Sequence, residues 1–104
     1  MIIYTDQKNF NKVKQTKKLF ILDVFASWCG PCQMIAKEFE NLDHEEDLFF
    51  DIVKINSDEN YELASSLKVS VLPTLIIFKD GEEVERLEGF RRANDIMHIM
   101  EKHK

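Results

Sequence analysis

The arrangement of apolar residues along the chain predicts strands and helices that alternate. Residues 19–26, with the sequence LFILDVFA, are almost continuously apolar and rich in bulky side chains. A run this short and this apolar is typical of a strand buried on both faces, at the centre of an α/β sheet. Asp80-Gly81 lies between two further strand-like runs and predicts a tight hairpin. The other predicted strands are residues 2–4, 48–56, 74–78 and 84–87.

Helices are predicted in most of the intervals between these strands. In residues 31–42, apolar side chains recur on one face, and Pro31 suits the first helical position, where its missing N–H costs nothing. Thr5 or Asp6 is the expected N-cap of an earlier helix that continues to about Lys17. Two shorter helices are expected, one from Ser57 or Asp58 to residue 67 and one over residues 93–102. The predicted order is β-α-β-α-β-α-β-β-α, an α/β fold.

Length and charge narrow the class of protein. The 104 residues match a common domain size, so we expect one domain over residues 1–104 that folds without a structural metal. Fourteen basic and 19 acidic residues give a net charge of −5, which disfavours nucleic acid and anionic membranes as partners. No apolar run approaches 18 residues, and we expect a cytoplasmic protein. The acidic stretch 38–51 is either a solvated face, which is the commoner case, or a specific docking patch.

The two cysteines of the chain lie in the motif Trp28-Cys29-Gly30-Pro31-Cys32, between the predicted central strand and a helix. In the cytoplasm such a pair is more often catalytic or metal-binding than structural. The positive end of the helix favours a thiolate at Cys29, the form that attacks disulfides. Cys32 lies one turn further on, where it can resolve a mixed disulfide formed on Cys29.

Two other interpretations of the pair are a couple of inert buried thiols and half of a zinc site. A zinc site needs four ligands, and the three histidines, His44, His98 and His103, have no ligand spacing. We therefore expect no metal and favour redox chemistry.

Three residues outside the motif are candidates for a role in that chemistry. Asp23, in the central strand, is either an edge residue that reaches solvent or a buried base that exchanges a proton with Cys32. Lys54, on the neighbouring strand, is either the charge partner of Asp23 or a surface residue. Only about one X–Pro bond in twenty is cis, so the sequence by itself predicts a trans Pro73.

Further residues accompany the cysteine motif at characteristic spacing: Asp23, Lys54, Pro73-Thr74, Phe78-Lys79-Asp80-Gly81 and Gly89. Together with the motif they resemble the thioredoxin family, over residues 2–103. The resemblance implies a thioredoxin fold, in which helices flank both faces of a central mixed β-sheet. It also implies protein-disulfide reductase activity with Cys29 as nucleophile and Cys32 as resolving thiol.

The resemblance assigns further roles around the cysteines. Pro73 would be cis and face the disulfide, and the backbone of Leu72 would pair with the substrate. The expected docking patch is Trp28, Gly30, Pro31, Leu72, Pro73 and Gly89. The alternative for Trp28 is an ordinary half-buried aromatic residue.

The same resemblance implies the source of electrons. The Cys29–Cys32 disulfide would be the redox-active group, with no other cofactor, and NADPH would supply electrons through thioredoxin reductase or a similar flavoprotein. The substrates would be proteins with disulfides, and the chain a monomer. Two alternatives stay open, a dedicated electron donor to one partner enzyme and a non-enzymatic binding subunit.

The chain departs from the usual thioredoxin pattern at four places, one of which is the acidic stretch 38–51. Lys37 stands where a proline is usual, and Phe25 where a tryptophan is often found. Residues 68–71 lack the usual glycines before Pro73. These departures leave the motif chemistry intact and keep open whether the chain serves many targets or a narrower set.

Overall fold

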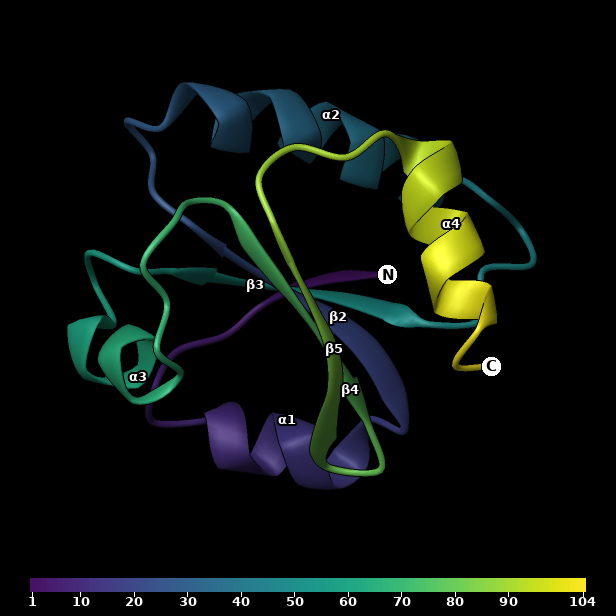
Figure 1. Ribbon diagram of the computed structural model, residues 1–104. Helices are drawn as coiled ribbons and strands as arrows, with labels where there is room; N and C mark the ends of the chain where they lie inside the picture. The colour runs from purple at the N-terminus through teal and green to yellow at the C-terminus, as the bar shows by residue number, and fades with distance from the viewer.

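The helices and strands follow one another in the predicted order. The computed structural model describes residues 1–104 and contains five strands and four helices (Figure 1). They are β1 Ile2–Tyr4, α1 Phe10–Thr16, β2 Leu19–Phe25, α2 Gly30–Asp43, β3 Asp51–Asn56, α3 Tyr61–Ser66, β4 Thr74–Lys79, β5 Glu82–Glu88 and α4 Ala93–Glu101.

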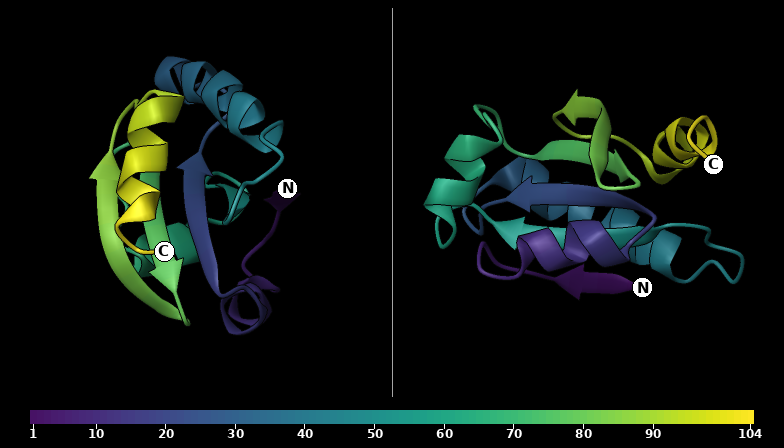
Figure 2. Two further views of the ribbon diagram at one scale, coloured as in Figure 1. Left: turned by 90° about the vertical axis from the view of Figure 1, so that its right-hand side faces the viewer. Right: turned by 90° about the horizontal axis from the view of Figure 1, so that it is seen from below.

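The five strands form one mixed sheet in the order β1-β3-β2-β4-β5. Strands β1, β3 and β2 are parallel, while β4 runs antiparallel to β2, and β5 antiparallel to β4. Figures 1 and 2 show α2 and α4 on one face of the sheet and α1 and α3 on the other. The prediction of a mixed sheet flanked by helices on both faces is confirmed, with β2 at the centre.

Each face of the sheet has its own hydrophobic core, because successive side chains of a strand point to opposite faces. On the side of α2 and α4, Ile21 packs with Ile35 and Phe39. On the other side, the rings of Phe20 and Phe78 stack with centroids 5.0 Å apart. Complete burial of one such side chain contributes about 1.5–3 kcal/mol. The same alternation places Asp23 and Lys54 on the face covered by α2.

Two helices begin later than predicted, because side chains of Asp and Asn form turns before them. Asp6 Oδ1 accepts the N–H of Asn9 at 2.9 Å, and α1 begins only at Phe10. Asn56 Oδ1 likewise accepts the N–H of Asp58 at 2.9 Å, and α3 begins at Tyr61. Such side chains satisfy backbone donors locally without extending the helix.

The third strand is also shorter than predicted. It begins at Asp51, although Leu48 and Phe49 pack against the core. The ladders with β1 and β2 begin at Ile52 and Asp51 respectively, so the preceding residues have no neighbouring strand to pair with. Apolar character alone therefore placed the start of this strand too early.

The predicted hairpin at Asp80-Gly81 is confirmed, although β5 begins at Glu82, two residues earlier than predicted. Lys79 pairs with Glu82 across the turn, and the two central residues, Asp80 and Gly81, both have positive φ values of 52° and 84°. Positive φ at both central positions is the geometry for which Asp-Gly is favoured.

No helix of the structure combines the length and the apolar character that crossing a membrane requires.

Candidate active site

The cysteine motif lies where β2 ends and α2 begins. Cys29 is the N-cap of α2, and its Sγ accepts the backbone N–H of Cys32 at 3.2 Å. Pro31 lies in the first turn, and α2 begins at Gly30, one residue before the predicted start at Pro31. The first N–H groups of a helix lack intrahelical partners and carry the positive end of its dipole, so this position stabilises negative charge on the Cys29 sulfur.

Cys29 and Cys32 form a disulfide, with their Cα atoms 5.2 Å apart. The two residues are only 5% and 3% exposed and pack with Ala26 in a small cluster of their own. Phe25 and Leu72 pack against this cluster. Neighbouring side chains therefore cover almost all of the surface of both cysteines.

The segment around Pro73 lies beside the disulfide. The Leu72–Pro73 peptide bond is cis, so the expectation from general X–Pro frequencies is wrong and the one from the family resemblance is confirmed. The carbonyl oxygen of Leu72 is 3.7 Å from Cys29 Sγ. Gly89 donates its N–H to the carbonyl of Pro73 at 2.8 Å, with a φ of 89° that favours glycine. The fold thus brings Leu72, Pro73 and Gly89 together next to Cys29.

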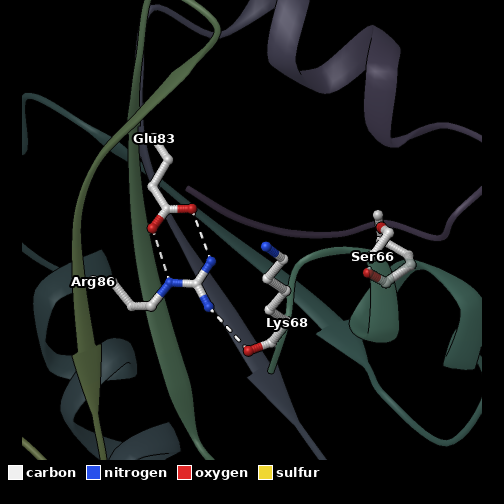
Figure 3. Close-up of polar contacts among 5 residues, drawn as sticks. Ser66, Lys68, Glu83 and Arg86 are labelled. Atoms are coloured by element: carbon white, nitrogen blue, oxygen red, sulfur yellow. Dashed lines mark hydrogen bonds and ion pairs between the residues drawn. The ribbon is translucent and has the colours of Figure 1, made fainter. Parts of the chain in front are cut away.

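The loop that leads to Leu72 is held by β5. Arg86 donates two hydrogen bonds of 2.8 Å to the carboxylate of Glu83, and a longer one, 3.4 Å, to the carbonyl of Lys68 (Figure 3). The hydrogen bonds from Arg86 hold the pKa of Glu83 below its usual range. Lys68 follows the C-cap of α3 with a φ of 59°, at the glycine-poor segment noted in the sequence. Thr74 donates its hydroxyl to the carbonyl of Val71 and closes the loop.

Trp28 is 70% exposed, so it is not an ordinary half-buried aromatic residue. Its indole Nε1–H donates to Asp58 Oδ2 at 2.7 Å, which fixes the orientation of the ring. The sequence indicated Asp58 only as a helix start, and it gave no signal for this contact across 30 residues.

Asp23 is fully buried, and neither of its carboxylate oxygens accepts a hydrogen bond. The interpretation as an edge residue in contact with solvent or a backbone donor is therefore wrong. Lys54 Nζ lies 3.7 Å from Asp23 Oδ2, close enough for an ion pair but too far for a good hydrogen bond. Burial raises the pKa of Asp23 to about 6, and the positive charge of Lys54 offsets part of this increase. The carboxyl group can therefore gain or lose a proton near neutral pH.

Lys54 is buried too, and aromatic rings surround it. Its side chain is 8% exposed, and Nζ lies 5.0 Å from the ring centroid of Phe25 and 5.6 Å from that of Tyr4. The two rings meet edge to face, 6.3 Å apart. Cation–π contacts of this kind stabilise an ammonium group away from bulk water. The surface interpretation of Lys54 is thus wrong, and the sequence pattern did not reveal the contribution of Tyr4 and Phe25.

No group of three or more His, Cys, Asp or Glu side chains is arranged to hold a metal ion. Of the three histidines considered as zinc ligands, His103 lies beside a carboxylate, with its Nε2 2.7 Å from Glu85 Oε1.

Comparisons with known proteins agree with this geometry. The family model described as Thioredoxin matches residues 1–102. Thioredoxin of Staphylococcus epidermidis is 40% identical over 99 residues, which cover 95% of this chain and 93% of that protein. Thioredoxin of Staphylococcus haemolyticus is 38% identical over 102 residues, 98% of this chain and 97% of its own length.

Solved structures give the same result. A mutant thioredoxin from Halobacterium salinarum superimposes with a TM-score of 0.88 at 34% identity, covering 97% of this chain and 88% of that one. Fasciola hepatica thioredoxin gives a TM-score of 0.85 at 31% identity, with complete coverage of both chains. With its cysteine pair at disulfide distance beside a cis-proline, the chain belongs to the thioredoxin family and is a thiol–disulfide oxidoreductase that reduces protein disulfides.

Proposed function

We propose that Cys29 is the nucleophile and Cys32 the resolving thiol of this reaction. The observation that carries the proposal is the place of Cys29 Sγ at the N-terminus of α2, where it accepts the N–H of Cys32. The Cys29 thiolate attacks one sulfur of the substrate disulfide, and the other sulfur leaves as a thiolate. Cys32 then attacks Cys29 Sγ, the mixed disulfide breaks, and the second substrate thiol is released. Two electrons pass to the substrate, and the chain is left with its Cys29–Cys32 disulfide.

In this scheme Asp23 takes the proton that Cys32 loses as it attacks. Three features support the assignment: the carboxyl group is buried on the face covered by α2, it has no hydrogen-bond partner, and its pKa lies near 6. Lys54, held by the ion pair and by two aromatic rings, stabilises the ionised carboxylate. Asp23→Asn is expected to slow release of the mixed disulfide more than its formation.

We propose that protein substrates dock on the patch formed by Trp28, Gly30, Pro31, Leu72, Pro73 and Gly89. The exposed indole of Trp28 and the position of the Leu72 carbonyl beside Cys29 Sγ support this assignment. A substrate segment in extended conformation would pair with the backbone of Leu72, which places its sulfur in line with Cys29.

Electrons are proposed to come from NADPH through thioredoxin reductase or a similar flavoprotein, with no prosthetic group in this chain. We also propose that residues 1–104 work as one domain, a cytoplasmic monomer without nucleic-acid or membrane partners. The net charge of −5 supports the last point, because binding to phosphate-rich surfaces depends on an excess of Lys and Arg.

Reduction of insulin disulfides, coupled to thioredoxin reductase and NADPH, tests the proposed electron path and the breadth of the substrates. The wild-type chain is expected to turn over, and Cys29→Ser to be inactive. If the wild type reduces insulin very slowly but serves one partner enzyme well, the chain is a dedicated donor. If Cys29→Ser, Cys32→Ser retains full biological activity, the chain acts as a binding subunit and the redox assignment is wrong.

A further inference from the structure

A groove begins at the cysteine motif and runs along α2 towards the start of α4. It has a volume of about 450 Å³ and is lined by Gly30, Met34 and Phe90 among others. Gly30 is the neighbour of Cys29, and nothing lies within 4 Å of the position that a Cβ atom would occupy there. Met34 is 56% exposed. The groove therefore begins beside the reactive cysteine, and Met34 and Phe90 are the apolar part of its lining.

The lining of the groove includes two positively charged side chains that have no ion-pair partner. Lys37 lies on α2, and Arg92 immediately precedes α4 on the loop that crosses near α2 in Figure 1. Both side chains are exposed, and neither takes part in any of the ion pairs of the structure. Lys37 is the residue that replaces the usual proline of the family.

The groove also contains one carboxylate, that of Glu38, but it already has a partner. Its Oε1 accepts the backbone N–H of Ala93 at 2.8 Å and so satisfies a free donor at the start of α4. The three charged residues of the lining give it a net positive charge, on a chain whose total charge is −5. The net positive charge of the groove is therefore opposite in sign to the net charge of the whole molecule.

We infer that the groove binds an acidic side chain of the substrate segment that reacts with Cys29, and that Lys37 and Arg92 determine this preference. The inference rests on the proposed role of Cys29 as nucleophile. Lys37 follows Gly30 by about two turns of helix, which is about 10 Å at the rise of an α-helix. An extended chain covers that distance in about three residues. The recognised Glu or Asp therefore lies about three residues from the substrate cysteine.

The net charge of the whole molecule would favour basic peptides, which is the opposite of the preference inferred for the groove. A chain of charge −5 repels acidic peptides at long range, so a faster reaction with an acidic peptide must come from local contacts. The sign of the preference thus separates the groove from general steering.

The test uses two synthetic peptides, each with a single cysteine. One peptide has Glu at the third position before and after the cysteine, the other has Lys at both positions, and the two are otherwise identical. The cysteine is linked to thionitrobenzoate, whose release on attack by the reduced protein is followed by absorbance. The wild-type chain is expected to react about 2- to 10-fold faster with the Glu peptide at low salt, as expected for two exposed ion pairs. Added salt should reduce the difference.

The variant Lys37→Gln, Arg92→Gln is expected to lose the preference. Its control is Lys8→Gln, Lys12→Gln, which removes the same charge from exposed lysines just before and within α1, on the opposite face of the sheet, and should keep the preference. Circular dichroism and thermal unfolding check that both variants are folded. Equal rates with the two peptides in the wild type, a faster reaction with the Lys peptide, or an unchanged preference in Lys37→Gln, Arg92→Gln would overturn the inference. A wild type that reacts with neither peptide would instead contradict the role of Cys29.

Discussion

The burial of Asp23 has a measurable consequence for stability. Its pKa is about 6 in the folded chain, against 3.8 for an unperturbed carboxyl group, because burial disfavours the ionised form. Between these two pH values the folded state holds a proton that the unfolded state has lost. The free energy of unfolding therefore falls as pH rises through this window.

The size of the effect follows from the two pKa values. A difference of 6 minus 3.8, multiplied by 1.36 kcal/mol for each pH unit, gives about 3 kcal/mol. This penalty is absent below the lower pKa and fully present above the higher one. Asp23→Asn removes the ionisation and should abolish this part of the pH dependence.

The assay is denaturation by urea of the oxidised protein between about pH 3.5 and 8, analysed by linear extrapolation. We expect the stability of the wild type to fall relative to Asp23→Asn by about 3 kcal/mol across this range. Burying an amide beside Lys54 changes the stability of Asp23→Asn by the same amount at every pH. The test therefore compares how the free energies of unfolding of the two proteins change with pH, not their values at one pH. Asp47→Asn, at an exposed site that takes part in none of the ion pairs, is the control and should follow the wild type. If the difference in the free energy of unfolding between wild type and Asp23→Asn does not change with pH, the claim that burial raises the pKa of Asp23 is refuted.

Three further predictions concern neighbouring contacts. Lys54→Met removes the positive charge beside Asp23 and should raise the pKa of Asp23 by about 1 or more, measured by carbon NMR titration of its carboxyl group; an unchanged pKa would show that the ion pair is ineffective. Asp58→Ala frees the indole of Trp28, so we expect the fluorescence anisotropy of Trp28 to fall and the KM for insulin to rise about two- to fivefold at unchanged kcat. An unaltered KM would show that Asp58 has no part in substrate docking. Lys68→Gly relieves a positive φ just after α3 and should raise stability by about 0.5 kcal/mol in urea denaturation, whereas Lys68→Ala should not; a loss of stability on Lys68→Gly would contradict strain at this position.

The sequence predicted the order of the elements and the centre of the site, because both depend on local signals. An apolar run marks β2, and Asp80-Gly81 marks the hairpin between β4 and β5. The cysteine motif likewise identifies itself by its spacing and by the helix that follows Pro31. Helix starts were placed too early where an Asp or Asn side chain makes a local turn, since a cap and a turn share the same residue types.

Contacts between distant elements were not predictable from local pattern. The aromatic surroundings of Lys54 depend on the register that pairs it with Tyr4 on β1 and with Asp23 on β2. The hydrogen bond from Trp28 to Asp58 joins two loops. The cis bond at Pro73 was expected only through the family resemblance, because frequency alone favours trans.

The assignment of Cys29 as nucleophile is tested most directly by trapping. Reduced Cys32→Ser, mixed with a protein disulfide, is expected to accumulate a mixed disulfide on Cys29, identified by peptide mass mapping. Cys29→Ser should accumulate none under the same conditions, because Cys32 lies one turn inside α2 and not at its N-cap, where the free N–H groups stabilise a thiolate. Accumulation on Cys32 in Cys29→Ser, with none on Cys29 in Cys32→Ser, would reverse the two roles and contradict the mechanism.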